Sequence, residues 1–124
     1  MTTPRRKLGD IGEQHVRSIL EGDGMTWLGS NWRCASGELD LIMQHGTEIV
    51  FVEVKVRRGE SRGAAEEAVG RAKAEKLLAT ADWYIGEHFP NDAPPWRIDL
   101  FAITLDNTGQ IVRRTHIENA IQTG

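Results

Sequence analysis

The stretch of residues 37–55, GELDLIMQHGTEIVFVEVK, decides the fold because it contains two strands joined by a tight turn. Side chains alternate between the two faces of a strand, so residues two apart share a face. Glu38 and Asp40 therefore point the same way on the first strand, and Glu53 and Lys55 do so on the second. Each strand carries its charges at alternate positions within an otherwise apolar run.

The turn between the two strands sets their register. Gly46-Thr47 predicts a two-residue type II′ hairpin, in which glycine supplies the positive φ. Counting back from this turn places Asp40 opposite Glu53, and Glu38 opposite Lys55. Opposite side chains have Cβ atoms roughly 5 Å apart, and like charges so close are destabilising unless something neutralises them. A bound divalent cation would neutralise these three carboxylates.

The rest of the chain predicts two helices and three further strands around this hairpin. Apolar residues at helical spacing predict a helix over residues 5–21, which the glycines of 22–24 end. We expect the second helix over residues 64–88, unbroken or interrupted near Gly70, with Val69, Ala72, Lys76, Ala79 and Trp83 on its apolar stripe. The five predicted strands are about 25–33, 38–44, 48–57, 96–103 and 110–114. An α/β arrangement, an antiparallel meander with helices on its faces, accommodates the order α-β-β-β-α-β-β.

Length and composition limit the class of protein. The 124 residues suffice for one domain, 1–124, with a basic arm at 1–7 and a tail at 115–124 as candidate flexible ends. We expect no membrane segment, because no apolar run approaches the roughly 20 residues that span a bilayer. The basic N-terminus has no apolar signal core behind it, and the single Cys34 cannot form an internal disulfide. A cytoplasmic location is therefore expected.

The charged residues of the hairpin have the composition of a metal-dependent hydrolytic site. Hard cations such as Mg²⁺ prefer oxygen ligands, and phosphodiester hydrolysis benefits from a cation beside the phosphate. Asp40, Glu53 and Lys55 supply the minimum set, two ligands and one group that acts on the attacking water. The alternative is an ordinary polar hairpin face, with Glu38 and Lys55 as a cross-strand ion pair.

Several blocks of the sequence, in order along the chain, resemble a known family. An aspartate on one strand followed by Glu-x-Lys on the next is similar to the PD-(D/E)XK nuclease superfamily, which includes restriction enzymes and Holliday-junction resolvases. The chain looks most like the YraN family of small bacterial predicted endonucleases. The blocks that carry this resemblance are Gly12-Glu13, Asn31-Trp32-Arg33, residues 37–42, residues 51–55 and Arg97-Ile98-Asp99. The resemblance implies a restriction-endonuclease-like α/β fold, in which an antiparallel three-strand meander and further strands form a mixed sheet with helices on both faces.

The resemblance also implies roles for individual residues. Asp40 and Glu53 would be ligands of Mg²⁺ or Mn²⁺, helped by the main-chain carbonyl of Val54, and Lys55 would act on the attacking water. Glu13 matches a helix-borne acid that supports the metal in the resolvase-like branch. From the residues alone, Glu13 reads as a surface position on the helix.

Further charged residues have two possible roles each. Lys73 matches a recurrent family lysine, which would contact a phosphate or remain solvated, and Glu38 would pair with Lys55 or support the metal. Arg57 and Arg58, with Lys73, become a nucleic-acid-binding surface if they rim the acidic patch, and a solvated face otherwise. The four histidines lack ligand-type spacing, which argues against zinc. We expect all four tryptophans in the core, with Trp32 the weakest case.

These observations lead to three hypotheses about function. The first is a metal-dependent endonuclease acting on DNA, with branched DNA as a candidate substrate and a homodimer as the family-level expectation. The second is a non-catalytic nucleic-acid-binding or adaptor module that retains the nuclease fold. The third is a domain that acts through protein partners alone. Cleavage that depends on both the metal and the carboxylates would distinguish the first hypothesis from the others.

Overall fold

A computed structural model describes residues 4–59 and 70–122 of the chain. The predicted loop at 61–63 and the first part of the predicted second helix, 64–69, lie outside these residues. Helix α1 spans Pro4–Gly22 and α2 spans Arg71–His88. The strands are β1 (Thr26–Cys34), β2 (Gly37–His45), β3 (Glu48–Arg58), β4 (Trp96–Leu105) and β5 (Ile111–Ile121).

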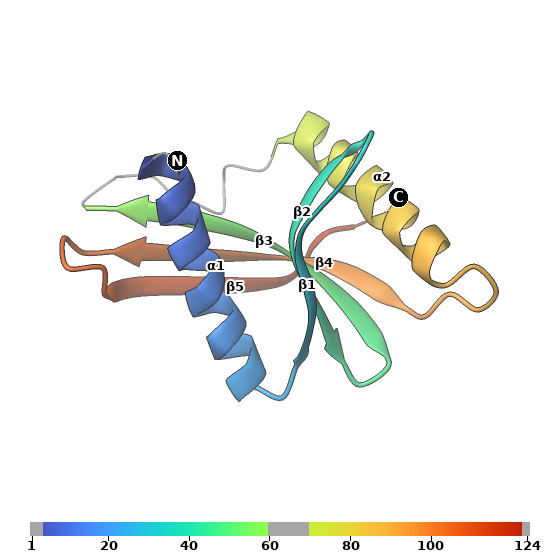
Figure 1. Cartoon of the computed structure of the whole chain (residues 1–124), viewed down its shortest axis with the longest axis horizontal. Coiled ribbons are helices and arrows are strands. Elements are labelled where there is room, and N and C mark those ends of the chain that lie inside the picture. The colour runs from blue at the N-terminus through green and yellow to red at the C-terminus, as the bar shows by residue number, and fades with distance from the viewer. Residues whose placement is uncertain (1–3, 60–69, 123–124) are drawn as a thin grey trace.

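The five strands form one mixed sheet in the order β1-β2-β3-β4-β5 (Figure 1). The β1–β2, β2–β3 and β4–β5 pairs are antiparallel, and the central β3–β4 pair is parallel. Because α2 lies between β3 and β4 in the chain, it is the crossover that a parallel pair requires. The α/β class, the mixed sheet and the order α-β-β-β-α-β-β are as predicted. The antiparallel meander expected from the residues is limited to β1, β2 and β3, because the long connection after β3 returns the chain as a parallel neighbour.

The β2–β3 turn follows the predicted hairpin chemistry. Gly46 has φ +63°, and His45 pairs with Glu48 across the turn, which is the predicted register. Thr47 is not among the described residues with positive φ, so the turn has the type II′ pattern. The ladder of paired residues continues back to Leu41 and Val52 and ends there.

The two faces of β3 belong to two different apolar clusters. Val50 and Val52 pack with Val16 and Leu20 of α1, and Val54 and Val56 extend the same cluster. Ile49 and Phe51 face the other way and pack with α2. The sheet therefore has a helix on each face, as Figure 1 shows. The predicted alternation along β3 is confirmed.

Two element-level predictions differ from the structure. The fifth strand, predicted to end at Arg114, continues to Ile121 and so includes most of the proposed flexible tail. Its pairing with β4 extends as far as Ile98 opposite Ile121. The predicted stripe of α2 was wrong: Trp83 is exposed, and the buried residues are Leu77, Thr80, Ala81, Tyr84 and Ile85.

The tryptophans divide between core and surface. Trp32 and Trp96 pack against the cluster beneath α2, so core packing is confirmed for them. Trp27 and Trp83 are exposed, which contradicts the prediction. Trp27 lies on the edge strand β1, where its ring contacts the Arg17 guanidinium, 3.8 Å from the ring centroid. Within the described ranges 4–59 and 70–122, no helix is long and apolar enough to cross a membrane.

Candidate functional site

Asp40 lies where β2 and β3 separate. The ladder of paired residues ends at Leu41–Val52, one residue before Asp40 would face Glu53. The backbone N–H of Val54 instead donates to Asp40 Oδ2 at 2.9 Å. The Asp40 carboxylate thus accepts the hydrogen bond that a β2 backbone carbonyl would otherwise accept from the Val54 N–H. This contact holds the carboxyl group beside β3.

The Asp40 and Glu53 carboxyl groups are brought close together. Burial and the neighbouring charge of Glu53 raise the pKa of Asp40 to about 8, and a side-chain hydrogen bond with Glu53 acts in the same direction. Glu53 is itself buried, with 7% of its surface exposed. Ionising both of two buried carboxyl groups so close together costs electrostatic free energy. A proton shared by the pair, or a bound cation, lowers this cost.

Two lysines approach the same oxygen of Glu53. Lys73 Nζ lies 2.7 Å from Glu53 Oε1, and Lys55 Nζ lies 3.8 Å from it. Burial and the adjacent Lys73 lower the pKa of Lys55. Burial acts to lower the pKa of Lys73, but the hydrogen bonds with Glu53 and Lys55 and the charges of Glu53 and Asp40 together outweigh it, and the pKa is raised. Lys55 is therefore the more readily deprotonated of the two.

Glu38 does not pair with Lys55, which corrects one of its two predicted roles. Its Oε2 accepts from Arg33 Nε at 3.0 Å. The reason is the sheet register, because Arg33 lies directly opposite Glu38 in the β1–β2 ladder. The β2–β3 ladder has already ended before Glu38 could face β3. Glu38 still lines the same cavity as Asp40 and Glu53, but the close carboxyl contact is that of the Asp40–Glu53 pair.

Glu13 approaches this pair from α1. Its charge contributes to the raised pKa of Asp40, as the smallest of the causes. Its side chain lines a different cavity, of about 390 Å³, together with Arg17 and Asn31. Glu13 is thus near enough to act on Asp40 electrostatically.

The predicted basic residues divide between the faces of the sheet. Alternation along β3 places Arg57 on the face of Glu53 and Lys55, and exposed Arg58 on the opposite face. Lys73 reaches the carboxylates from α2. Arg58 does not lie with the acidic pair, because it is an odd number of residues away from Glu53.

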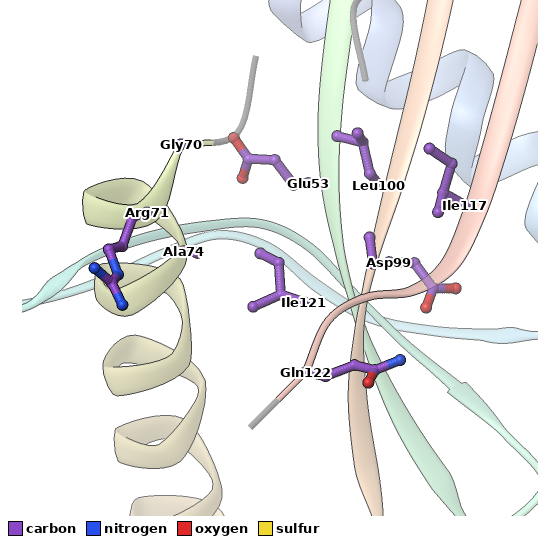
Figure 2. A pocket seen from close by; sticks show the side chains of 10 residues that line it. Glu53, Gly70, Arg71, Ala74, Asp99, Leu100, Ile117, Ile121 and Gln122 are labelled. Atoms are coloured by element: carbon purple, nitrogen blue, oxygen red, sulfur yellow. The ribbon is translucent and has the colours of Figure 1, made fainter. Parts of the chain in front are cut away.

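Glu53 separates two cavities. One, of about 290 Å³, has Asp40, Lys73 and Lys76 in its wall. The other, of about 350 Å³, lies between the start of α2 and β4–β5 and has apolar walls at Leu100 and Ile117 (Figure 2). A ligand held at Glu53 could therefore extend to either side.

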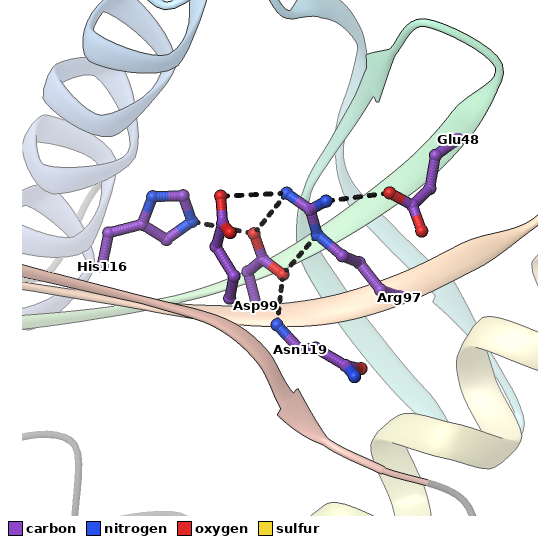
Figure 3. A network of polar contacts seen from close by, with 6 residues as sticks. Glu48, Arg97, Asp99, His116 and Asn119 are labelled. Carbon is purple, nitrogen blue, oxygen red and sulfur yellow. Dashed lines mark hydrogen bonds and ion pairs between the residues drawn. The ribbon is translucent and has the colours of Figure 1, made fainter.

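A second polar cluster, to which the sequence analysis assigned no role, surrounds Asp99 (Figure 3). The Asp99 carboxylate is fully buried and accepts hydrogen bonds from Arg97 Nε and from the Asn119 backbone N–H, each at 2.9 Å. His116 Nε2 lies 2.8 Å from the same carboxylate. Arg97 also donates to Glu48 on β3 at 2.8 Å. The spacing Arg97-x-Asp99 was a usable signal, since it places both side chains on one face. His116 could not be found, because β5 was predicted to end before it.

The acidic pair has the ligand chemistry of a Mg²⁺ or Mn²⁺ site. Among residues 4–59 and 70–122, no three His, Cys, Asp or Glu side chains gather into a ready-made metal cluster. Mg²⁺ commonly uses only one or two carboxylates and takes its other ligands from water and substrate phosphate. Asp40 and Glu53 meet that requirement. Burial first, and the charge of Glu53 second, raise the pKa of Asp40, and a bound cation would favour its ionised form against both effects.

Comparison with known proteins gives the family of this chain. The model of a protein family described as uncharacterised protein family UPF0102 matches residues 12–103. A UPF0102 protein of Roseiflexus castenholzii is 40% identical over 122 residues, which cover 98% of each chain. A UPF0102 protein of Syntrophotalea carbinolica is 42% identical over 103 residues, 83% of each chain. The YraN-like resemblance is thereby confirmed at the level of the family, and the chain belongs to UPF0102.

Proposed function

We propose that this protein is a metal-dependent endonuclease of the PD-(D/E)XK superfamily, which hydrolyses phosphodiester bonds in DNA. The observation that carries the proposal is the Asp40–Glu53 pair, held where β2 and β3 separate and flanked by two lysines. It combines oxygen ligands, cationic groups and an adjoining cavity within one small region. Branched or otherwise structured DNA is the proposed substrate, from the resolvase-like resemblance.

In this proposal the residues divide the work of hydrolysis. Asp40 and Glu53 would hold Mg²⁺ or Mn²⁺, and the ion would supply positive charge that stabilises the phosphate in the reaction. Lys55 orients the attacking water and takes its proton, because its lowered pKa leaves more of its amine neutral than in an ordinary lysine. The water oxygen bonds to phosphorus, the bond to the leaving oxygen breaks, and the leaving oxygen takes up a proton from solvent. Arg57, beyond Lys55 on the same face, is the proposed contact to the DNA backbone.

The test is a cleavage assay with branched, nicked and single-stranded DNA under titration of Mg²⁺ and Mn²⁺. We expect Asp40→Asn and Glu53→Gln to lower the cleavage rate by at least roughly 100-fold, because each removes a charge-stabilising group from the reaction centre. The matched control is Glu87→Gln, which neutralises an exposed carboxylate at the far end of α2 and should leave the rate unchanged.

The outcomes separate the candidate functions. Equal cleavage by wild type and Asp40→Asn would assign the activity to a contaminant. DNA binding without cleavage in either metal would favour the non-catalytic module. Absence of DNA binding at low salt, where phosphate contacts are strongest, would contradict both.

A further inference from the structure

The shortest ion pair of the site joins Glu53 to a helix residue, not to the neighbouring strand lysine. Lys73 Nζ lies 2.7 Å from Glu53 Oε1, which is the length of a charge-assisted hydrogen bond. Lys55 Nζ lies 3.8 Å from the same oxygen. Lys73 therefore supplies the nearest positive charge to one of the two proposed metal ligands.

The two members of this ion pair differ in exposure. The Glu53 side chain is 8% exposed, whereas the Lys73 side chain is 41% exposed. The carboxylate is thus fixed, while the ammonium sits at the end of a flexible stem that can move into solvent. A lysine released in this way regains rotamer freedom, which favours its displacement.

The position of Lys73 also matters for any ligand that enters. Lys73 and Asp40 line the same cavity of about 290 Å³. A divalent cation bound to both carboxylates would lie beside the Lys73 ammonium, whichever Glu53 oxygen it took, because Lys73 already contacts that carboxylate. Two positive charges so close repel each other, so the cation and Lys73 compete for Glu53.

We propose that Lys73 is a built-in counter-ion, which neutralises Glu53 in the metal-free protein and is displaced when a divalent cation binds. This inference rests on the proposed metal site. Once displaced, Lys73 stays at the mouth of the cavity, where it can meet a phosphate group of the substrate. Lys55 fits this role less well than Lys73, because its Nζ is farther from Glu53 Oε1 and its side chain is only 27% exposed.

The experiment measures Mn²⁺ binding without DNA, by isothermal titration calorimetry on wild type, Lys73→Met, Lys73→Arg and Lys76→Met. We expect Lys73→Met to bind Mn²⁺ about 10-fold more tightly, since the competing charge is gone. Lys73→Arg keeps a positive charge and should stay close to wild type. Lys76→Met is the matched control, because it removes one exposed lysine from the same helix and the same cavity wall.

A second measurement uses urea unfolding of the metal-free proteins. Lys73→Met should be less stable than Lys76→Met without metal, because it leaves buried Glu53 without its nearest cation. Saturating Mn²⁺ should reduce this difference. The comparison does not depend on any cleavage activity.

Each outcome has a definite meaning. Equal Mn²⁺ affinity in wild type and Lys73→Met would overturn the counter-ion proposal but leave the metal site standing. An equal increase in Mn²⁺ affinity in Lys73→Met and Lys76→Met would also overturn it. The increase would then come from lowering the overall positive charge of the cavity, and not from removing the ion pair with Glu53. If neither wild type nor any lysine variant binds Mn²⁺ at millimolar concentration, the proposed metal site and this inference both fall.

Discussion

Asp40 accepts the Val54 backbone N–H at the residue where the β2–β3 ladder ends, and its carboxyl group lies against Glu53. The sequence predicted that these two acids would lie close together. It attributed the approach to strand pairing, whereas the side chain itself makes the bridge to β3. The difference matters, because a side chain can place its oxygens in the gap between diverging strands.

The titration of Asp40 leads to a prediction about stability. Burial and Glu53 raise the pKa of Asp40 from 3.8 to about 8 in the folded protein. The folded state therefore binds the proton more tightly than the unfolded state, and this stabilisation is complete below about pH 4. As the pH rises towards about 8, we expect the free energy of unfolding in EDTA to fall by a few kcal/mol, on the order of one per pKa unit.

Urea denaturation between pH 4 and pH 9 in EDTA measures this dependence. Asp40→Asn should flatten the curve, while Asp82→Asn, an exposed position on α2, should not. Saturating Mn²⁺ should reverse the trend, because metal binding requires the deprotonated carboxylate. A slope that is unchanged in Asp40→Asn would contradict the assignment to this residue.

At the scale of the elements, close contact between α1 and β3 brings Glu13 towards the carboxylates. A Cβ atom at Gly12 would clash with the Cγ2 of Val56. The helix can therefore lie this close to the strand only because residue 12 has no side chain. Glu13 follows directly in the sequence and acts on Asp40 from this helix.

This contact predicts opposite effects for two substitutions of helical glycine. Gly12→Ala should lower the free energy of unfolding by about 1–3 kcal/mol, because the new methyl group overpacks against Val56. Gly9→Ala should raise it by up to about 1 kcal/mol, since no atom lies within 4 Å of a Cβ there and alanine favours the helix. Chemical denaturation of both variants tests the prediction. A stabilising Gly12→Ala would contradict the close packing.

The buried face of α2 could not be predicted from the sequence of the helix alone. The stripe proposed from the sequence included Ala72, Ala79 and Trp83, all of which are exposed. The buried face instead centres on Leu77, Ala81 and Tyr84, because these residues meet β1, β2 and β3. An alanine-rich helix has apolar residues on several faces, so its own periodicity does not select one.

At the scale of the whole molecule, the Asp99 cluster ties three strands together. Arg97 and Asp99 lie on β4, Glu48 on β3, and His116 and Asn119 on β5. The contacts to β5 lie well beyond Arg114, where the sequence placed the end of that strand. We attribute the length of β5 to this anchoring, together with its pairing to β4.

Removing the carboxylate should therefore weaken the whole sheet. We expect Asp99→Ala to lower the free energy of unfolding by about 3–5 kcal/mol, because it leaves Arg97 largely buried without its main partner. Glu118→Gln removes only an exposed contact to Arg97 at 3.6 Å and should cost less than about 1 kcal/mol. Urea denaturation gives both values, and amide exchange should show the loss of protection in β5. Equal costs for the two variants would refute the anchoring role.

The sequence by itself determined the order of elements, the β2–β3 turn and the alternation along β3, because these depend on local backbone chemistry and a period of two. It also singled out Asp40, Glu53 and Lys55. Tertiary structure decided the rest: the pairing of Glu38 with Arg33, the contact of Lys73 with Glu53, and the strand that reaches His116. Each of these depends on which element becomes the neighbour of another. Such neighbours are fixed by the packing of the whole chain, since side chains far apart in sequence meet only when both apolar clusters have formed.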